Sequence, residues 1–396
     1  MTAPARVSAA AAAAVPAVRI GYVLGAFPVL SETFVSGEVA QVARAGALGP
    51  VFVFDPRAGL APDPALVAHL RPVAGLATAG RWPPAALARA LWLTRGLPLA
   101  GRASLLRHAG RIAAAARAAG ATHLHAHFGG GAALHGLLAA RLAGLGFSLT
   151  LHSGAYARDF DTPAAARLLI GQADAVVGAT EALAATARAE GARRAVTIAC
   201  GADLDRFRPI AGAAHNGRLL ALGRLIDCKG IDTAISALAG IDGARRPGLD
   251  IVGAGPEQGR LAALAAGLGV AVRFLGPRPN DWVAAEAGGY MALVAPFRHG
   301  RDGQVDSGPV VLKEALALGL PVITTDLPGP AGIVADAGAV VPADHPAALA
   351  LAIARTAALT PAARQRVARR ARARAGAFGL NAQAAALIAL AAEVAP

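Results

Sequence analysis

The sequence predicts an α/β protein with two doubly wound parallel sheets whose strand ends face a common cleft. The first observation is its length, because 396 residues exceed one ordinary core and suit two domains of about 150–200 residues each. The second is composition, since 55% hydrophobic and 16% charged residues exclude a disordered or coiled-coil chain. The third is that short apolar runs alternate with alanine-rich segments of helical length, which is typical of βαβ units.

The first half of the chain contains six predicted strands separated by helix-length segments. They cover residues 18–23, 51–54, 123–128, 148–152, 175–178 and 196–199. Residues 1–16 are alanine-rich and are expected to form a disordered tail, whereas residues 17–209 are expected to form the N-terminal Rossmann-like domain.

The strand pattern restarts after Phe207-Arg208-Pro209, where residues 210–217 are predicted to be a linker. Six further strands are predicted at residues 219–223, 250–253, 272–275, 290–294, 321–324 and 339–341. We therefore expect a second Rossmann-like domain over residues 210–378 and a C-terminal helix within 379–396 that packs back on either domain. Ligands are expected in the cleft between the domains, at the carboxyl ends of the strands.

Features that would direct the chain out of the cytoplasm are weak. No apolar run reaches the roughly 18–20 residues needed to span a membrane, and the first 16 residues lack a convincing secretory cleavage pattern. Cys200 and Cys228 could form at most one bridge, so a disulfide scaffold is excluded and a reducing compartment is favoured. We expect a cytoplasmic protein.

The net charge of +13 is concentrated in one stretch, residues 81–118, which has no acidic residue. Its arginines are interleaved with Trp82, Trp92 and several leucines; they are Arg81, Arg89, Arg95, Arg102, Arg107, Arg111 and Arg117. Such a pattern suits a peripheral contact with an anionic membrane surface, and it equally suits a solvated arginine face. Nucleic acid is not expected, since no recognisable binding module accompanies the charge.

Two cations lie where the fold predicts a phosphate site. Gly223-Arg224 ends a predicted strand, and Lys229-Gly230 precedes the next helix, so the loop and the helix N-terminus could cradle a diphosphate. Only one other lysine, Lys313, occurs in this arginine-rich chain, which indicates a need for a compact cation at 229. The alternative is that Lys229 is an incidental surface residue.

A second cluster covers residues 302–314, between a predicted strand and a helix. Ser307-Gly308-Pro309 resembles a helix start with Pro309 in the first turn, where free backbone N–H groups attract phosphate. Glu314 lies nearly two turns into an otherwise apolar helix. Since an unpartnered buried carboxylate is costly, a ligand hydroxyl is its expected partner.

Several segments together resemble the family 4 retaining glycosyltransferases, and most of all the exopolysaccharide (colanic-acid type) branch. The segments are SETF (31–34), ACGADLDRFRP (199–209), LGRL (222–225) with Lys229-Gly230, IVGAGPE (251–257) and FLG (274–276). The resemblance covers nearly the whole chain. It implies the GT-B fold, with the acceptor handled by the first domain and a nucleotide-sugar donor held mainly by the second.

The resemblance also implies site residues. Arg224 and Lys229 would bind the diphosphate, and the Glu-x7-Glu motif of the family falls on Asp306 and Glu314, with Asp in place of the first Glu. Glu314 would bind the ribose, Asp306 and His152 would lie near the sugar, and the start of the helix would contact the donor through Ser307, Gly308 and Val310. The expected catalytic residues are His152, Arg224, Lys229 and Asp306. Three further residues are expected to line the cleft on the first domain: Ser31, Glu32 and His127.

Metal sites were weighed and are not expected. His123, His125 and His127 share one face of a predicted strand, but zinc would need a fourth ligand, and similar transferases carry such a strand without a metal. Asp159-Phe160-Asp161 and Asp203-Leu204-Asp205 mimic the DxD motif of the other glycosyltransferase fold; Asp205 is expected to cap a turn instead. No Gly-x4-Gly-Lys-Ser/Thr loop is present, which argues against an ATPase.

The sequence thus predicts a metal-independent, cofactor-free retaining hexosyltransferase, in which a nucleotide sugar donates to a glycan or lipid-linked saccharide during cell-surface polysaccharide synthesis. Two alternatives remain open. One is a nucleotide-sugar epimerase of the same fold, and the other is a non-catalytic basic protein that binds membranes or nucleic acid.

Overall fold

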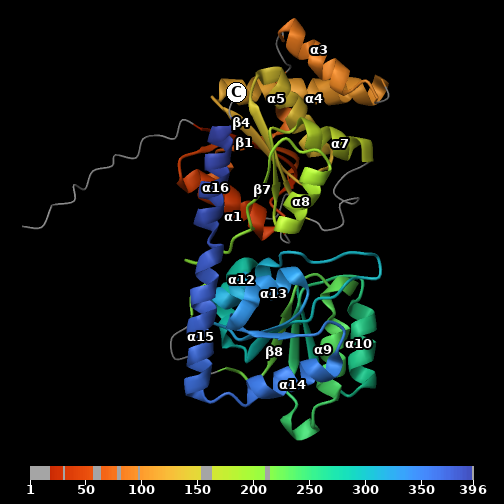
Figure 1. Ribbon diagram of the computed structural model, residues 1–396, viewed down its shortest axis with the longest axis vertical. Coiled ribbons are helices and arrows are strands. Elements are labelled where there is room, and N and C mark those ends of the chain that lie inside the picture. The colour runs from red at the N-terminus through yellow and green to blue at the C-terminus, as the bar shows by residue number, and fades with distance from the viewer. Residues whose placement is uncertain are drawn as a thin grey trace, which may run out of the picture.

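Two parallel sheets, one in each half of the chain, organise the computed structural model (Figure 1). The structure describes residues 18–29, 32–56, 64–77, 82–96, 99–152, 163–209 and 215–394. Each sheet is covered by helices on both faces, and the two domains are stacked along the long axis of the molecule, with β1 and β4 in one and β8 in the other (Figure 1).

The first sheet has seven strands in the order β3-β2-β1-β4-β5-β6-β7. Its strands are β1 (Ile20–Phe27), β2 (Leu48–Pro56), β3 (Leu70–Pro72), β4 (His123–His127), β5 (Gly146–Leu151), β6 (Ala175–Gly178) and β7 (Ala195–Thr197). The helices of this half are α1 (Thr33–Arg44), α2 (Pro64–Val67), α3 (Pro84–Leu93), α4 (Leu99–Ala118), α5 (Gly131–Ala143), α7 (Pro163–Gln172) and α8 (Glu181–Ala189), with a short 3₁₀ turn η1 (Val73–Gly75).

The second sheet has six strands in the order β10-β9-β8-β11-β12-β13. They are β8 (Leu219–Leu222), β9 (Leu249–Val252), β10 (Val272–Gly276), β11 (Ala292–Ala295), β12 (Val322–Thr325) and β13 (Ala339–Val341). The helices are α9 (Ile231–Ala239), α10 (Gln258–Gly267), α11 (Asn280–Glu286), α12 (Val310–Ala317), α13 (Pro328–Val334), α14 (Pro346–Ala357), α15 (Pro361–Ala375) and α16 (Leu380–Glu393). The 3₁₀ turns are η2 (Asp227–Lys229), η3 (Gly243–Arg245), η4 (Ala287–Gly289), η5 (Ala335–Ala337) and η6 (Gly376–Phe378).

Both sheets follow the doubly wound order, and the predicted fold class is confirmed. The twelve predicted strands are all present, with ends displaced by a few residues. β3 was missed because it is only three residues long, partly exposed and ends in Pro72, so its sequence carries almost no strand signal.

The chain crosses between the domains twice, and the two crossings pair with each other. Ala202 donates to the carbonyl oxygen of Phe378 at 2.8 Å, and Leu380 donates to that of Ala202 at 3.1 Å. Phe207 is fully buried in the second core, so the first crossing lies nearer to residue 202 than to the expected boundary at 209. After the second crossing α16 packs on α1, so the last helix belongs to the first domain (Figure 1).

Within the described ranges, no single helix is long and apolar enough to cross a membrane. One pair, Pro346–Ala357 with Pro361–Phe378, passes that test only when its two helices are taken together, and they are bent by 114° at the break. Cys200 and Cys228 are both buried free thiols.

Candidate active site

A cavity of about 880 Å³ lies between the domains, at the carboxyl ends of both sheets. The first domain contributes the start of α1 and the residues after β4 and β5, among them Glu32, Phe34 and His152. The second domain contributes the ends of β8 and β9, the loop before α12 and the first turns of α12. Segments far apart in the sequence therefore converge on one space.

The ends of β8 and β9 approach each other so closely that only glycine can occupy them. Gly223 has φ of 144° and Gly253 has φ of 138°, and a Cβ on Gly253 would lie 1.9 Å from the carbonyl oxygen of Gly223. This approach brings the residue after Gly223 to the cavity wall. Arg224 is exposed there and lines the cavity, as predicted for a ligand-binding cation.

Lys229 lies at the end of the η2 turn and also lines the cavity. Its ammonium group donates to the Asp306 carboxylate at 2.5 Å and lies 4.9 Å from the centre of the Phe297 ring. Two of the predicted catalytic residues are therefore paired with each other. Their side chains are only 14% and 24% exposed, so each holds the other in a defined position.

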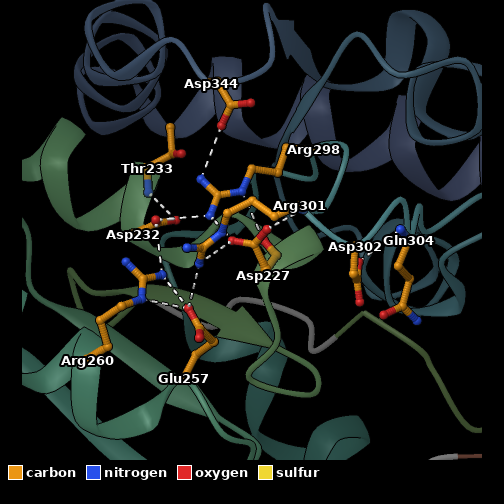
Figure 2. A network of polar contacts seen from close by, with 10 residues as sticks. All are labelled: Asp227, Asp232, Thr233, Glu257, Arg260, Arg298, Arg301, Asp302, Gln304 and Asp344. Atoms are coloured by element: carbon orange, nitrogen blue, oxygen red, sulfur yellow. Dashed lines mark hydrogen bonds and ion pairs between the residues drawn. The ribbon is translucent and has the colours of Figure 1, made fainter.

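A network of charged residues fastens the η2 turn from its other side (Figure 2). Arg298 donates to the backbone carbonyl oxygen of Asp227 at 3.0 Å and pairs with the carboxylates of Asp227, Asp232 and Asp344. The backbone N–H of Arg301 donates to the Asp227 carboxylate at 2.7 Å. Hydrogen bonds from Arg301 and Arg298 hold the pKa of Asp227 well below its usual range, so this network remains ionised and keeps the Lys229 turn in place.

Helix α12 points its N-terminus at the cavity. Pro309 precedes the helix, and Gly308, Pro309 and Val310 line the wall, where helix N–H groups and the helix dipole favour an anion. The helix begins one residue after Pro309, which the sequence had placed within the first turn.

Glu314 is 6% exposed yet lines the cavity. Burial raises the pKa of Glu314 to about 7, and the positive charge of Arg206 only partly opposes this effect. No side chain in the described ranges hydrogen-bonds its carboxylate. This is expected of a carboxylate whose partners are the hydroxyl groups of a ligand. The neighbouring Lys313 is not its partner, because the buried Lys313 ammonium group donates to the carbonyl oxygen of Cys200 at 2.6 Å.

His152 follows β5 and lies in the cavity wall between the rings of Phe34 and Phe128, whose centres are 4.6 and 4.8 Å from its own. Burial lowers the pKa of His152 well below 6.5, so the ring is neutral at physiological pH. A neutral imidazole can accept or donate a hydrogen bond to an uncharged sugar.

Two predicted site residues lie elsewhere. His127 does not line the cavity: it is 4% exposed at the end of β4 and lies behind His152, while the following Phe128 takes the wall position. Ser307 also lies outside the lining, because its backbone packs against Gly329; its hydroxyl is buried with no hydrogen-bond partner among the described residues. Glu32 lines the cavity at the start of α1, whereas Ser31 lies outside the described residues.

The residues that resemble metal ligands in the sequence have other partners in the structure or lie outside the described residues. Asp203 accepts backbone hydrogen bonds from Asp205 and Arg206, so Asp203, and not Asp205, caps the turn before Phe207. Asp159 and Asp161 lie outside the described residues. His125 and His127 face Glu38 on α1 with ligand atoms within 4.8 Å of one another. Both nitrogens of His125 are already hydrogen-bonded to the hydroxyl groups of Ser148 and Thr150, at 2.7 and 3.0 Å.

Several residues of the site escaped the sequence analysis. Phe128, Cys200 and Arg278 line the cavity. Each lies at the end of an expected strand or within three residues after it, which is the signal that could have found them. Glu38 lies under the site on the buried face of α1, between Val35 and Val39. The sequence signal that could have identified Glu38 is an acidic residue on an otherwise apolar helix face. Cys228 lines the cavity as well, but burial raises the pKa of its thiol, so it is not an activated nucleophile.

Comparison with known proteins agrees with this geometry. Residues 216–358 match the family described as glycosyl transferases group 1. WcaL of Escherichia coli K12, assigned as a colanic acid biosynthesis glycosyltransferase, is 32% identical over 133 residues, or 32% of each chain. The D-inositol 3-phosphate glycosyltransferase of Frankia alni is 31% identical over 256 residues, or 57% of this chain and 61% of that protein. The chain therefore matches less than two thirds of either relative.

Solved structures match over almost the whole chain. Anabaena Alr3699/HepE in complex with UDP has a TM-score of 0.69 at 18% identity, covering 95% of this chain and 100% of that one. The sucrose-phosphate synthase of Thermosynechococcus elongatus has a TM-score of 0.65 at 20% identity, covering 95% and 98%. These comparisons confirm the GT-B fold and the predicted resemblance to family 4 glycosyltransferases, with residues 216–358 matching the glycosyl transferases group 1 family.

Proposed function

We propose that this protein is a retaining glycosyltransferase that moves a hexose from a nucleotide sugar to a saccharide acceptor. One observation carries the proposal: Arg224, Lys229, the N-terminus of α12 and the buried Glu314 all line the same interdomain cavity. The first three are complementary to a diphosphate and the last to ribose hydroxyls. The UDP bound to Alr3699/HepE is consistent with such a ligand.

In the proposed reaction the acceptor hydroxyl oxygen bonds to the anomeric carbon as the bond from that carbon to the diphosphate breaks. The bonding electrons leave with the diphosphate, and the hydroxyl proton passes to a diphosphate oxygen on the same face of the sugar. Arg224 and Lys229 stabilise the growing negative charge, which is commonly the largest contribution of such a site. His152 and Asp306 contact the sugar. With two cations and a helix N-terminus available, we expect no metal or cofactor requirement.

We further propose that the acceptor is a glycan or a lipid-linked saccharide of cell-surface polysaccharide synthesis, reached at the cytoplasmic membrane face. The support is the outer surface of α3, where Leu87, Leu91 and Trp92 are 41%, 37% and 56% exposed. Arg89 on α3, Arg95 just after it and Arg107 on α4 are exposed, and the Arg95 guanidinium lies 4.0 Å from the centre of the Trp92 ring. Arg102 is different, because it donates to the carbonyl oxygen of Leu91 and fastens α3 to α4.

The membrane contact is tested with vesicles. Replacement of Arg89, Arg95 and Arg107 by Gln should abolish co-sedimentation with anionic vesicles, since each arginine near such a surface contributes on the order of 1 kcal/mol. Arg366, Arg369 and Arg370 are exposed on α15, and their replacement by Gln is the charge-matched control. Release by a few hundred millimolar salt is expected, because the Debye length shrinks to about 3 Å at 1 M. Continued binding of the triple variant of Arg89, Arg95 and Arg107 would mean that these arginines form only a solvated face.

The function itself is tested with a thermal-shift panel of nucleoside diphosphates and nucleotide sugars. A ligand that binds only the folded state raises the melting temperature by mass action. A basic binding protein without a donor site would show no shift with any nucleotide. The fate of the sugar from the best donor then separates transfer to an acceptor from release as free sugar, which an epimerase of the same fold would produce.

A further inference from the structure

A buried chain of hydrogen bonds runs from the crossing between the domains to the cavity wall. Its members are Gly201, Gln383, Glu38, His127, His152 and Cys200, which come from the linker, α16, α1, β4, the end of β5 and the linker again. Only His152 and Cys200 of this set line the cavity. The others are within 5% exposure or belong to the backbone, and the proposed reaction gives them no role.

The direction of the first hydrogen bonds is fixed by a backbone group that can only donate. The N–H of Gly201 donates to Oε1 of Gln383 at 2.5 Å, so the other end of that amide must be its NH₂ group. This NH₂ group donates to Oε2 of Glu38 at 2.5 Å, and the hydroxyl of Tyr22 donates to Oε1 at 2.9 Å. Both oxygens of Glu38 are therefore acceptors.

The donors and acceptors of His127 and His152 follow from the same reasoning. Nε2 of His127 lies 3.1 Å from Oε1 of Glu38 and donates to it, so a His127 ring with a single proton presents its Nδ1 as an acceptor. Nδ1 of His127 lies 2.8 Å from Nε2 of His152, so His152 donates there. The remaining atom of the chain, Nδ1 of His152, carries a lone pair and lies 3.5 Å from the Cys200 sulfur.

The protonation of the flanking groups agrees with this assignment. Burial would raise the pKa of Glu38, but the interactions with His127, His125 and Tyr22 outweigh it and lower the pKa to about 2, so Glu38 is ionised. Burial raises the pKa of Cys200 to about 12, so its thiol keeps a proton to donate to His152. The other titratable neighbours are His125 on β4 and the Lys313 ammonium group, which is bonded to the Cys200 carbonyl oxygen.

We propose that Glu38, acting through His127, is a positioning residue that fixes His152 with its proton on Nε2, so that its bare Nδ1 accepts a hydrogen bond from a substrate hydroxyl. The substrate hydroxyl takes the place of the Cys200 thiol. The role in turnover rests on the proposed function, whereas the tautomer is a property of the ligand-free protein. An imidazole whose tautomer is set by a carboxylate is a general device for orienting such a group.

The test uses protein labelled with ¹⁵N at the histidine rings and long-range ¹H–¹⁵N spectra, with His152 assigned from the spectrum of His152→Asn. In the wild-type protein Nδ1 of His152 must resonate as an unprotonated nitrogen and Nε2 as a protonated one. The reverse pattern would overturn the proposal regardless of any activity measurement, and the result stands even if the enzyme transfers no sugar.

Glu38→Gln gives the sharper result. An amide at this position must present an NH₂ group either to Gln383 or to Tyr22 and His127. The second choice is easier, because the Tyr22 hydroxyl can rotate and His127 can move its proton, whereas Gln383 is held by Gly201. The proton of His152 should therefore move to Nδ1. Tyr22→Phe is the matched control, since it removes one hydrogen bond from Glu38 but keeps the carboxylate, and it should leave the tautomer unchanged.

Activity supplies a second readout. Glu38→Gln should lower kcat by about 10–100-fold, the range found when a residue that orients a metal-ligating imidazole is replaced, without weakening nucleoside diphosphate binding. In a His152→Ala background the same change should cost nothing further. An additional loss in that background, or an unchanged tautomer in the single variant, would mean that Glu38 serves only the stability of the fold.

Discussion

Glu314 offers a test in which stability and function move in opposite directions. The perturbation is Glu314→Gln, which keeps the shape of the side chain but cannot ionise. In the ligand-free protein the pKa of Glu314 is raised from 4.5 to about 7 by burial. Above pH 4.5 the unfolded chain loses this proton while the folded protein keeps it, so stability falls as pH rises until about pH 7, where both states are ionised.

The size of the effect follows from that difference. About 2.5 pH units at 1.36 kcal/mol each correspond to about 3 kcal/mol of destabilisation above pH 7. Glu314→Gln should remove this cost, so urea denaturation at pH 8 should show a more stable protein, by up to about 3 kcal/mol. The gain should shrink below about 1 kcal/mol at pH 5, where the folded protein still holds the proton.

The same variant should bind nucleotides more weakly. Ribose hydroxyls that donate to a carboxylate form hydrogen bonds to a charged group, and their loss should cost about 1.5–3 kcal/mol of nucleoside diphosphate affinity by calorimetry. Because those hydroxyls favour the ionised carboxyl, wild-type affinity should also rise as pH increases through 7, and this dependence should vanish in Glu314→Gln. Glu286→Gln, at an exposed position of α11, is the control. Unchanged stability at pH 8 together with unchanged affinity would refute the reasoning.

Three further predictions concern the ion pair, metals and acid stability. Asp306→Asn should slow turnover and yet tighten nucleoside diphosphate binding two- to tenfold, which is about 0.4–1.4 kcal/mol. The reason is that the Lys229 ammonium group would no longer be paired with a carboxylate. Weaker binding in a calorimetric titration would contradict this prediction. EDTA should leave the initial rate of transfer unchanged, whereas a loss that Mg²⁺ or Mn²⁺ restores would direct attention to Asp159 and Asp161. Burial lowers the pKa of His123 from 6.5 to about 4, so the unfolded chain binds a proton that the folded protein cannot, and the free energy of unfolding should fall by about 3 kcal/mol between pH 6.5 and pH 4. Chemical denaturation of His123→Gln should show a smaller decline; an equal one would remove His123 from this effect.

The structure alters one expectation drawn from the sequence. The motif alone suggests that Asp306 addresses the sugar and leaves nucleoside diphosphate affinity nearly unchanged when it is replaced by Asn. The short contact with Lys229 makes the two residues one unit, so a change at Asp306 must reach the diphosphate. Spacing along a chain cannot reveal such a contact, because these residues are 77 positions apart and meet only where the two loops fold together.

Much of the fold could be predicted because its causes are local. Apolar runs such as residues 175–178 and 339–341 match the strands β6 and β13 residue for residue. Short or polar elements such as β3 could not be found, since three partly exposed residues are held by their neighbours and not by their own preference. The first crossing between domains was misplaced because the burial of Phe207 in the second core depends on tertiary contacts.

The lining of the cavity could be predicted where a charged residue follows a strand or lies near the start of a helix, as for Arg224, Lys229 and Glu314. The lining could not be predicted where it depends on how deeply a side chain is buried. His127 and His152 each end or follow a neighbouring strand, and only the three-dimensional structure shows that one ring lies behind the other. The hydrogen bond between Gln383 and Glu38, which lie behind the two histidines, joins residues 345 positions apart.

The central claim is that Arg224 and Lys229 hold the diphosphate of a nucleotide sugar in the interdomain cavity. Its most direct test is a calorimetric titration of the best nucleoside diphosphate from the thermal-shift panel into wild-type protein, Arg224→Ala, Lys229→Ala and the control Arg355→Ala, whose arginine is exposed at the far end of α14. We predict that each cavity variant loses at least about 1.5–3 kcal/mol of binding free energy, as for other hydrogen bonds to charged groups, while the control binds like wild type. Wild-type affinity in both cavity variants, with their folds intact, would contradict the account.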